Sequence, residues 1–122
     1  MRLLYVEDDR VNAILFEQLC LQEPALEVRC ADSGADAFAL VADWQPDVLV
    51  LDLHLPDIDG FALLAKLRGR PTLHAAPAFL CTAEESDDVL ERALASGFDG
   101  CWTKPVDVRA MRAALERFGR SQ

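Results

Sequence analysis

The 122-residue chain lacks the features that mark several large protein classes. No apolar run approaches the length of a membrane-spanning helix, and acidic residues begin at Glu7, before the apolar region of a signal peptide could form. The chain has 12 basic against 21 acidic residues, and its net charge of −9 disfavours binding to nucleic acid or to an anionic membrane, which requires a basic face. We therefore expect a cytoplasmic protein that binds neither membranes nor nucleic acid directly.

Motifs built on paired cysteines are also missing. The four cysteines are too scattered for a CxxC metal or redox motif, and each lies in an apolar stretch: Cys20, Cys30, Cys81 and Cys101. We expect reduced, buried cysteines that act as small apolar side chains. The chain has no linker or low-complexity tract, and its length suits one domain. We expect a single domain over residues 1–122, with no output domain.

Five short apolar runs alternate along the chain with segments of helical periodicity. The runs are Leu3–Val6, Leu26–Cys30, Val48–Leu51, Ala78–Cys81 and Phe98–Trp102. The third run is apolar throughout, which is typical of a parallel strand covered on both faces. The pattern predicts an α/β fold in which five βα units form a doubly wound domain with a five-stranded parallel sheet.

The helical segments carry apolar stripes and start signals. Val108, Met111, Leu115 and Phe118 form one stripe at helical spacing. Capping residues precede three helices: Asp32 or Ser33 before Gly34–Trp44, Asp57 or Asp59 before the third helix, and Asp107 before the last.

Charged and hydroxyl side chains follow the predicted strands, where open α/β sheets bind their ligands. These residues are Glu7-Asp8-Asp9 after the first run, Asp52 after the third, Thr82 after the fourth and Thr103-Lys104-Pro105 after the fifth. Converging carboxylates repel one another unless a cation neutralises them, and oxygen ligands favour Mg²⁺ or Mn²⁺ over zinc. Any single strand-end acid is more commonly a helix cap, and a lone lysine a surface charge. Their coincidence at the strand ends indicates phosphate chemistry.

Asp52 is central among these groups, and a carboxylate can accept a phosphoryl group to form an acyl phosphate. Lys104 supplies a compact positive charge for one phosphoryl oxygen, and Thr82 a hydroxyl donor for another. Lysine is scarce in the chain, since only Lys66 and Lys104 are present.

These residues resemble the receiver domains of two-component response regulators, whose fold is flavodoxin-like, and the likeness covers essentially the whole chain. The segments that carry it are Leu4–Asp9, Val50–Gly60, Leu80–Ala83 and Trp102–Pro105, in this order and spacing. The resemblance implies that Asp52 is the phosphoacceptor. The donor would be a phosphohistidine on a sensor histidine kinase or a histidine phosphotransfer protein.

The resemblance also implies the roles of neighbouring groups. Glu7, Asp8, Asp52 and the backbone carbonyl of His54 would hold Mg²⁺, with Glu7 acting through water. The pair Asp8-Asp9 is an alternative to Glu7-Asp8, which keeps the family spacing to Asp52. Thr82 and Lys104 would bind the phosphoryl oxygens, and the peptide before Pro105 would be cis.

Phosphorylation would then draw in Thr82 and its loop and alter the face from about Glu84 to Phe118, where an unknown downstream protein binds. The protein would act as a monomer or as a phosphorylation-dependent dimer. It would be a phosphoacceptor that assists its own phosphorylation and dephosphorylation rather than an enzyme.

One departure from the family concerns the switch. Receiver domains usually carry an aromatic residue three positions before the conserved lysine, where this chain has Cys101 followed by Trp102. Trp102 should point to the opposite side of the strand from Cys101. Either Cys101 is buried filler beside a partly exposed Trp102, or Trp102 belongs to the partner surface.

Two further positions flank the expected site. His54 and Glu84, two residues after Asp52 and Thr82, either tune the lifetime of the acyl phosphate or are simple exposed polar residues.

Two other functions compete with this interpretation. A Mg²⁺-dependent aspartyl phosphatase resembling the haloacid dehalogenases is disfavoured, because that group needs a second acid where this chain has His54. A receiver-shaped interaction module that is never phosphorylated remains the main alternative, and Cys101 supports it.

Overall fold

The computed structural model describes residues 1–84, 86–104 and 106–120, and for residues 108 and 118–120 it describes the backbone alone. Its elements, in chain order, are β1 (Arg2–Val6), α1 (Arg10–Cys20), β2 (Glu27–Ala31), α2 (Gly34–Asp43), β3 (Val48–Asp52), α3 (Gly60–Leu67), a short 3₁₀ turn (Pro71–Leu73), β4 (Ala78–Thr82), α4 (Asp87–Ala95), β5 (Gly100–Thr103) and α5 (Val108–Arg120). The strands form one parallel sheet in the order β2-β1-β3-β4-β5. The predicted α/β architecture is confirmed.

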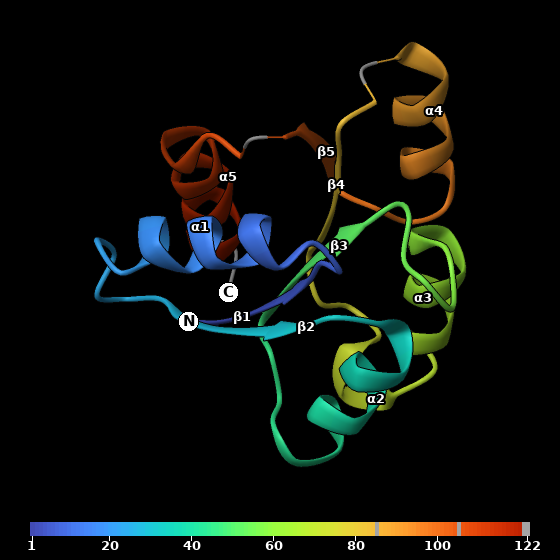
Figure 1. The fold of residues 1–122 in the computed structure, drawn as a ribbon, viewed down its shortest axis with the longest axis horizontal. Coiled ribbons are helices and arrows are strands. Elements are labelled where there is room, and N and C mark those ends of the chain that lie inside the picture. The colour runs from blue at the N-terminus through green and yellow to red at the C-terminus, as the bar shows by residue number, and fades with distance from the viewer. Residues whose placement is uncertain (85, 105, 121–122) are drawn as a thin grey trace.

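Helices cover both faces of the sheet (Figure 1). One face packs against α1 and α5, through side chains such as Phe16 and Met111. The other packs against α2, α3 and α4, through side chains such as Val41, Leu64 and Ala93. Because β3 is central and covered on both sides, all five of its residues are buried, as its continuous apolar run predicted.

Several predicted boundaries were wrong by one or two residues. β5 begins at Gly100 rather than Phe98, because the Phe98 N–H donates to the carbonyl of Ala93 at the end of α4. Phe98 is apolar because its side chain is buried in the core, not because it belongs to the strand. Likewise α2 ends at Asp43, and Trp44 is the residue that follows the helix.

The structure decides between the two candidate capping residues that the sequence offers for α2 and for α3. Ser33 caps α2, since its Oγ accepts from the N–H of Asp36, and Asp59 caps α3 by accepting from the N–H of Ala62 at 2.8 Å. Asp107 Oδ1 accepts from the N–H of Arg109 at the start of α5. Asp57 caps no helix that follows it; its carboxylate instead accepts from the first N–H groups of α2 and ties the β3–α3 loop to that helix.

The predicted burial of the cysteines holds for two of the four. Cys20 and Cys81 are buried, whereas Cys30 and Cys101 are half-buried, because β2 and β5 are the edge strands. In the stripe predicted for α5, Met111 and Leu115 are buried, and the side chains of residues 108 and 118 lie outside the description. Among the helices that the structure describes, none combines the length and hydropathy needed to cross a bilayer.

Candidate functional site

Four of the singled-out residues meet at one edge of the sheet. Asp52 and Thr82 end β3 and β4, while Glu7 and Lys104 directly follow β1 and β5. Because the strands are parallel and adjacent, their carboxyl ends lie together. Glu7, Asp52 and Thr82 are the polar or charged residues that are buried in the described part of the chain.

Three carboxylates form the floor of this site. Glu7, Asp8 and Asp52 each offer an oxygen, and these oxygens all lie within 4.8 Å of one another. Glu7 and Asp52 are buried, while Asp8 is exposed. The alternative pair Asp8-Asp9 is disfavoured, because the carboxylate of Asp9 accepts from the N–H groups of Val11 and Asn12 and caps α1.

Lys104 bridges two of the acids. Its Nζ lies 2.6 Å from Glu7 Oε1 and 3.2 Å from Asp52 Oδ2, and its side chain is largely buried. Burial by itself would lower the pKa of Lys104, but the hydrogen bond to Glu7 and the charge of Asp52 outweigh it and raise that pKa. The ammonium is therefore charged at neutral pH and positioned between the two carboxylates.

The buried acid Glu7 has a raised pKa. Burial, followed by its contact with Asp52, raises the pKa of Glu7 from 4.5 to about 7, although Lys104 works in the opposite direction. Its Oε2 atom is buried and has no hydrogen-bond partner. An unpartnered buried carboxylate oxygen within a cluster of three acids suits a hard cation such as Mg²⁺, whose preferred ligands are oxygens.

Thr82 lies beside this cluster at the end of β4. Its Oγ1 accepts from the N–H of Glu84 at 3.1 Å, and its carbonyl accepts from the N–H of Lys104 at 2.9 Å. The start of α3 also packs closely against the end of β3. A Cβ at position 60 would lie 2.5 Å from the carbonyl oxygen of Asp52. Glycine is required there to let the helix approach the strand end.

His54 and Glu84, which follow the strands that end in Asp52 and Thr82, are joined by a side-chain contact. His54 Nε2 lies 2.8 Å from Glu84 Oε1, and both side chains are mostly exposed. The contact links the loop after β3 to the loop after β4. The two flanking positions therefore form a pair, which the sequence did not predict.

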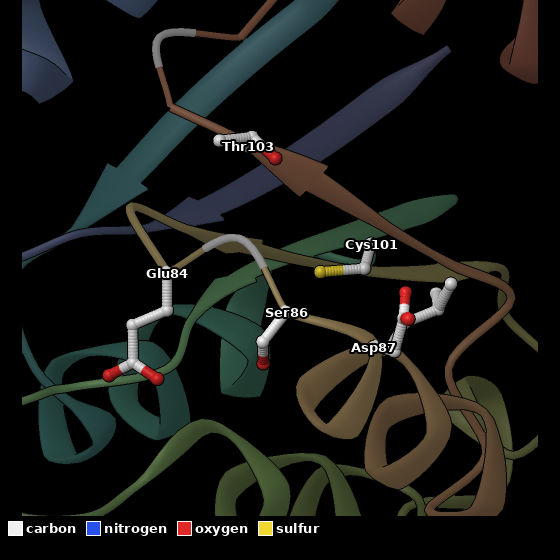
Figure 2. Close-up of a pocket in the computed structure, with 6 residues that line it drawn as sticks. Glu84, Ser86, Asp87, Cys101 and Thr103 are labelled. Atoms are coloured by element: carbon white, nitrogen blue, oxygen red, sulfur yellow. The ribbon is translucent and has the colours of Figure 1, made fainter.

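Cys101 and Trp102 point to opposite faces of β5, as alternation along a strand predicts. Trp102 stacks on Phe79, with ring centroids 4.4 Å apart, on the α1 and α5 side. Cys101 packs against the other core, beside a cavity of about 380 Å³. Figure 2 shows the Cys101 thiol directed towards the loop that carries Glu84 and Ser86. The small thiol leaves this space open between β5 and the start of α4.

The expected cis peptide before Pro105 falls outside the described residues.

Sequence reasoning missed one side chain of the site. Asn12, in the first turn of α1, donates from Nδ2 to Glu7 Oε1 at 3.0 Å. Its position one helical turn after the acidic cluster could have suggested this contact, since the first turn of α1 lies at the same edge of the sheet as Glu7.

Comparison with known proteins agrees with this geometry. The family model of the response regulator receiver domain matches residues 3–116. Over 106 residues the chain is 36% identical to the response regulator PleD of Caulobacter vibrioides, covering 87% of this chain and 23% of PleD, so it spans about a quarter of that relative.

Two solved structures share the fold over almost their whole length. The signal receiver domain of a DNA binding response regulator from Colwellia psychrerythraea has a TM-score of 0.85 at 25% identity, covering 98% of both chains. The chemotaxis response regulator CheY4 of Vibrio cholerae has a TM-score of 0.82 at 25% identity, covering 95% of this chain and 96% of its own.

Proposed function

This chain belongs to the family of response regulator receiver domains of two-component signalling, and from that premise we propose that Asp52 accepts a phosphoryl group from a phosphohistidine. The observation that carries the proposal is the grouping of Asp52 with two further acids, a half-buried lysine and a buried threonine at one sheet edge. The donor is a sensor histidine kinase or a histidine phosphotransfer protein, as the resemblance to receiver domains implies.

In the transfer step, a carboxylate oxygen of Asp52 attacks phosphorus while the bond from phosphorus to the donor imidazole nitrogen breaks. The product is an acyl phosphate on Asp52, and the donor histidine takes back the electron pair of the broken bond. Lys104 lies 3.2 Å from the attacking carboxylate and can follow the phosphoryl oxygens, while Thr82 supplies a hydroxyl donor. The chain acts here as a phosphoacceptor, which assists its own phosphorylation and dephosphorylation but is not a turnover enzyme.

Magnesium is the proposed cofactor, with Mn²⁺ as a substitute. Glu7, Asp8 and Asp52 would hold it together with the backbone carbonyl of His54, and the unpartnered Oε2 of Glu7 fits this role. When bound, it would neutralise negative charge on the carboxylates and the phosphoryl oxygens. Lys104 alone leaves the three acids with a net negative charge, which would repel a phosphoryl donor.

The switch would run through Thr82 and the loop that follows it. A phosphoryl group on Asp52 would accept a hydrogen bond from the Thr82 hydroxyl, whose oxygen already accepts from the N–H of Glu84, so a shift of Thr82 towards the phosphoryl group would be passed to the backbone at Glu84. The cavity beside Cys101, which Glu84 and Ser86 line, leaves these two side chains room to move without an aromatic side chain in the way. We place the downstream protein on the face made by α4, β5 and α5, which includes the half-buried Trp102.

The pair formed by His54 and Glu84 would tune the lifetime of the acyl phosphate. Its contact joins the loop after Asp52 to the loop after Thr82. We infer that the pair influences how water reaches phosphorus. We expect the double variant in which both residues are alanine to lose its phosphoryl group at a different rate from wild type, whereas equal rates would contradict this role.

A phosphohistidine donor needs a surface on which to dock, and α1 offers one. Val11, Leu15 and Leu19 recur every four residues along α1 and are exposed by 65%, 55% and 40%. This apolar stripe begins next to the acidic cluster and ends away from it. Replacing Leu15 with alanine, which adds no charge near Lys104, should weaken transfer from a phosphorylated kinase or phosphotransfer protein, yet leave transfer from acetyl phosphate unchanged. Loss of both would contradict the docking role.

Intact-mass spectrometry after incubation with acetyl phosphate tests the proposed function directly. We expect one phosphoryl adduct that requires Mg²⁺, disappears in Asp52→Asn and persists in Asp43→Asn, a control at an exposed acid of α2. Absence of an adduct with every donor would favour the interaction module that is never phosphorylated. Continuous hydrolysis of a phosphate ester would instead identify a phosphatase.

A further inference from the structure

Two side-chain donors converge on one oxygen of the buried acid Glu7. Lys104 Nζ lies 2.6 Å from Glu7 Oε1, and Asn12 Nδ2 donates to the same atom at 3.0 Å. The other oxygen, Oε2, is buried and accepts no hydrogen bond. The carboxylate is therefore held from one side only, and a single oxygen is left without a protein partner.

The local sequence fixes Asn12 in this position. The carboxylate of Asp9 caps α1 and accepts from the N–H of Asn12, which places Asn12 in the first turn, five residues after Glu7. Asn12 is half-buried and lines a small groove, together with Lys104 and Leu15 of α1. Its amide is thus ordered by the helix cap and by its neighbours in the groove.

We propose that Asn12 is a positioning residue of the metal site, which orients Glu7 so that Oε2 stays available to a divalent cation. The proposal rests on the proposed function, because it assumes that Glu7, Asp8 and Asp52 hold Mg²⁺. Lys104 cannot fulfil this role alone, since it also contacts Asp52 and is the group that follows the phosphoryl oxygens. The neutral amide of Asn12 can hold Glu7 throughout phosphoryl transfer. It adds no positive charge beside a dication.

Calorimetric titration with MgCl₂ tests this role without any phosphoryl donor. Asn12→Leu keeps the size of the side chain and removes the donor, and we expect it to bind Mg²⁺ about tenfold more weakly, as is typical when a group that orients a metal ligand is lost. Asn12→Gln keeps an amide and should bind more tightly than Asn12→Leu. Gln18→Leu, at an exposed amide of the same helix, is the matched control and should bind as wild type does.

A second readout follows the amide itself. Asn12 is the chain's single asparagine, so its side-chain NH₂ pair in a ¹⁵N spectrum can be identified by its absence from Asn12→Leu. We expect this pair to shift as Mg²⁺ binds, because the metal polarises the carboxylate that accepts its hydrogen bond.

The outcomes separate the two proposals. Equal Mg²⁺ affinity of wild type and a folded Asn12→Leu would overturn the positioning role and leave the proposed function intact. Lower stability of Asn12→Leu with unchanged Mg²⁺ affinity would also overturn it, since the amide would then be purely structural. Failure of wild type to bind Mg²⁺ would contradict the metal part of the proposed function, and the role of Asn12 with it.

Discussion

Replacing Glu7 with glutamine should stabilise the metal-free protein at alkaline pH. Burial and the neighbouring Asp52 raise the pKa of Glu7 from 4.5 to about 7 in the folded state. Between these values the folded chain keeps a proton on Glu7 that the unfolded chain has lost, so the free energy of unfolding falls as the pH rises. Each unit of difference between the two pKa values is worth about 1.4 kcal/mol, which sets an upper limit of about 3 kcal/mol on the loss.

Glutamine has the shape of protonated glutamate and no charge to bury, so Glu7→Gln should escape this loss. In urea unfolding with EDTA, we expect the variant to match wild type near pH 5 and to exceed it near pH 8 by up to about 3 kcal/mol. Mg²⁺ should reverse the order, because it stabilises the form that binds it. Glu91→Gln, at an exposed acid of α4, is the control. Equal losses between the two pH values in wild type and Glu7→Gln would refute the reasoning.

Three further predictions concern the scaffold around the site. Gly60→Ala should cost about 1–3 kcal/mol in urea unfolding and slow phosphorylation, because its Cβ would lie 2.5 Å from the carbonyl oxygen of Asp52; unchanged stability would show that α3 can move away. Ser33→Ala removes the cap of α2 and should cost about 1 kcal/mol in thermal unfolding, and a much smaller loss would mean that water replaces the cap. Hydrogen bonds from the first N–H groups of α2 lower the pKa of Asp57 below 3.8, so its contribution to stability is present above that pH and is lost as the pH falls through the folded pKa. Asp57→Asn should therefore flatten the acid limb of the stability curve, and an identical limb in both proteins would contradict this.

The fold could be predicted from the sequence because its signals are local and repeated. A run such as Val48–Leu51 is apolar throughout, and only a strand covered on both faces suits it. The errors lie where one residue type serves two purposes. Phe98 extends the apolar run before β5, yet it is buried as part of the turn that leaves α4. Burial and strand formation both favour phenylalanine, so the sequence alone cannot separate them.

The convergence of the site residues could also be predicted, because parallel strands in one sheet bring their carboxyl ends together. The choice between Glu7 and Asp9 as the partner of Asp8 could not be made from composition, since both are acids that suit a metal or a helix N-terminus. The backbone decides it: Asp9 lies where α1 begins, and its carboxylate is used by that helix. Asp8 is left as the exposed third member of the cluster.

The sequence does not predict which side chains of the site contact one another. His54 and Glu84 are 30 residues apart, and their contact depends on the rotamers of two exposed side chains on different loops. Lys104 and Asn12 meet on Glu7 Oε1 only because α1 and the end of β5 flank the same carboxylate. Each of these residues has an ordinary alternative, as a surface charge or a helix residue. What distinguishes Lys104 and Asn12 from ordinary surface residues is their shared contact with Glu7, whose Oε2 has no partner. A carboxylate with two donors on one oxygen and none on the other can bind a third group. If the proposed function holds, the raised pKa of Glu7 lowers the free energy of unfolding at neutral and alkaline pH, and a bound divalent cation would offset that loss.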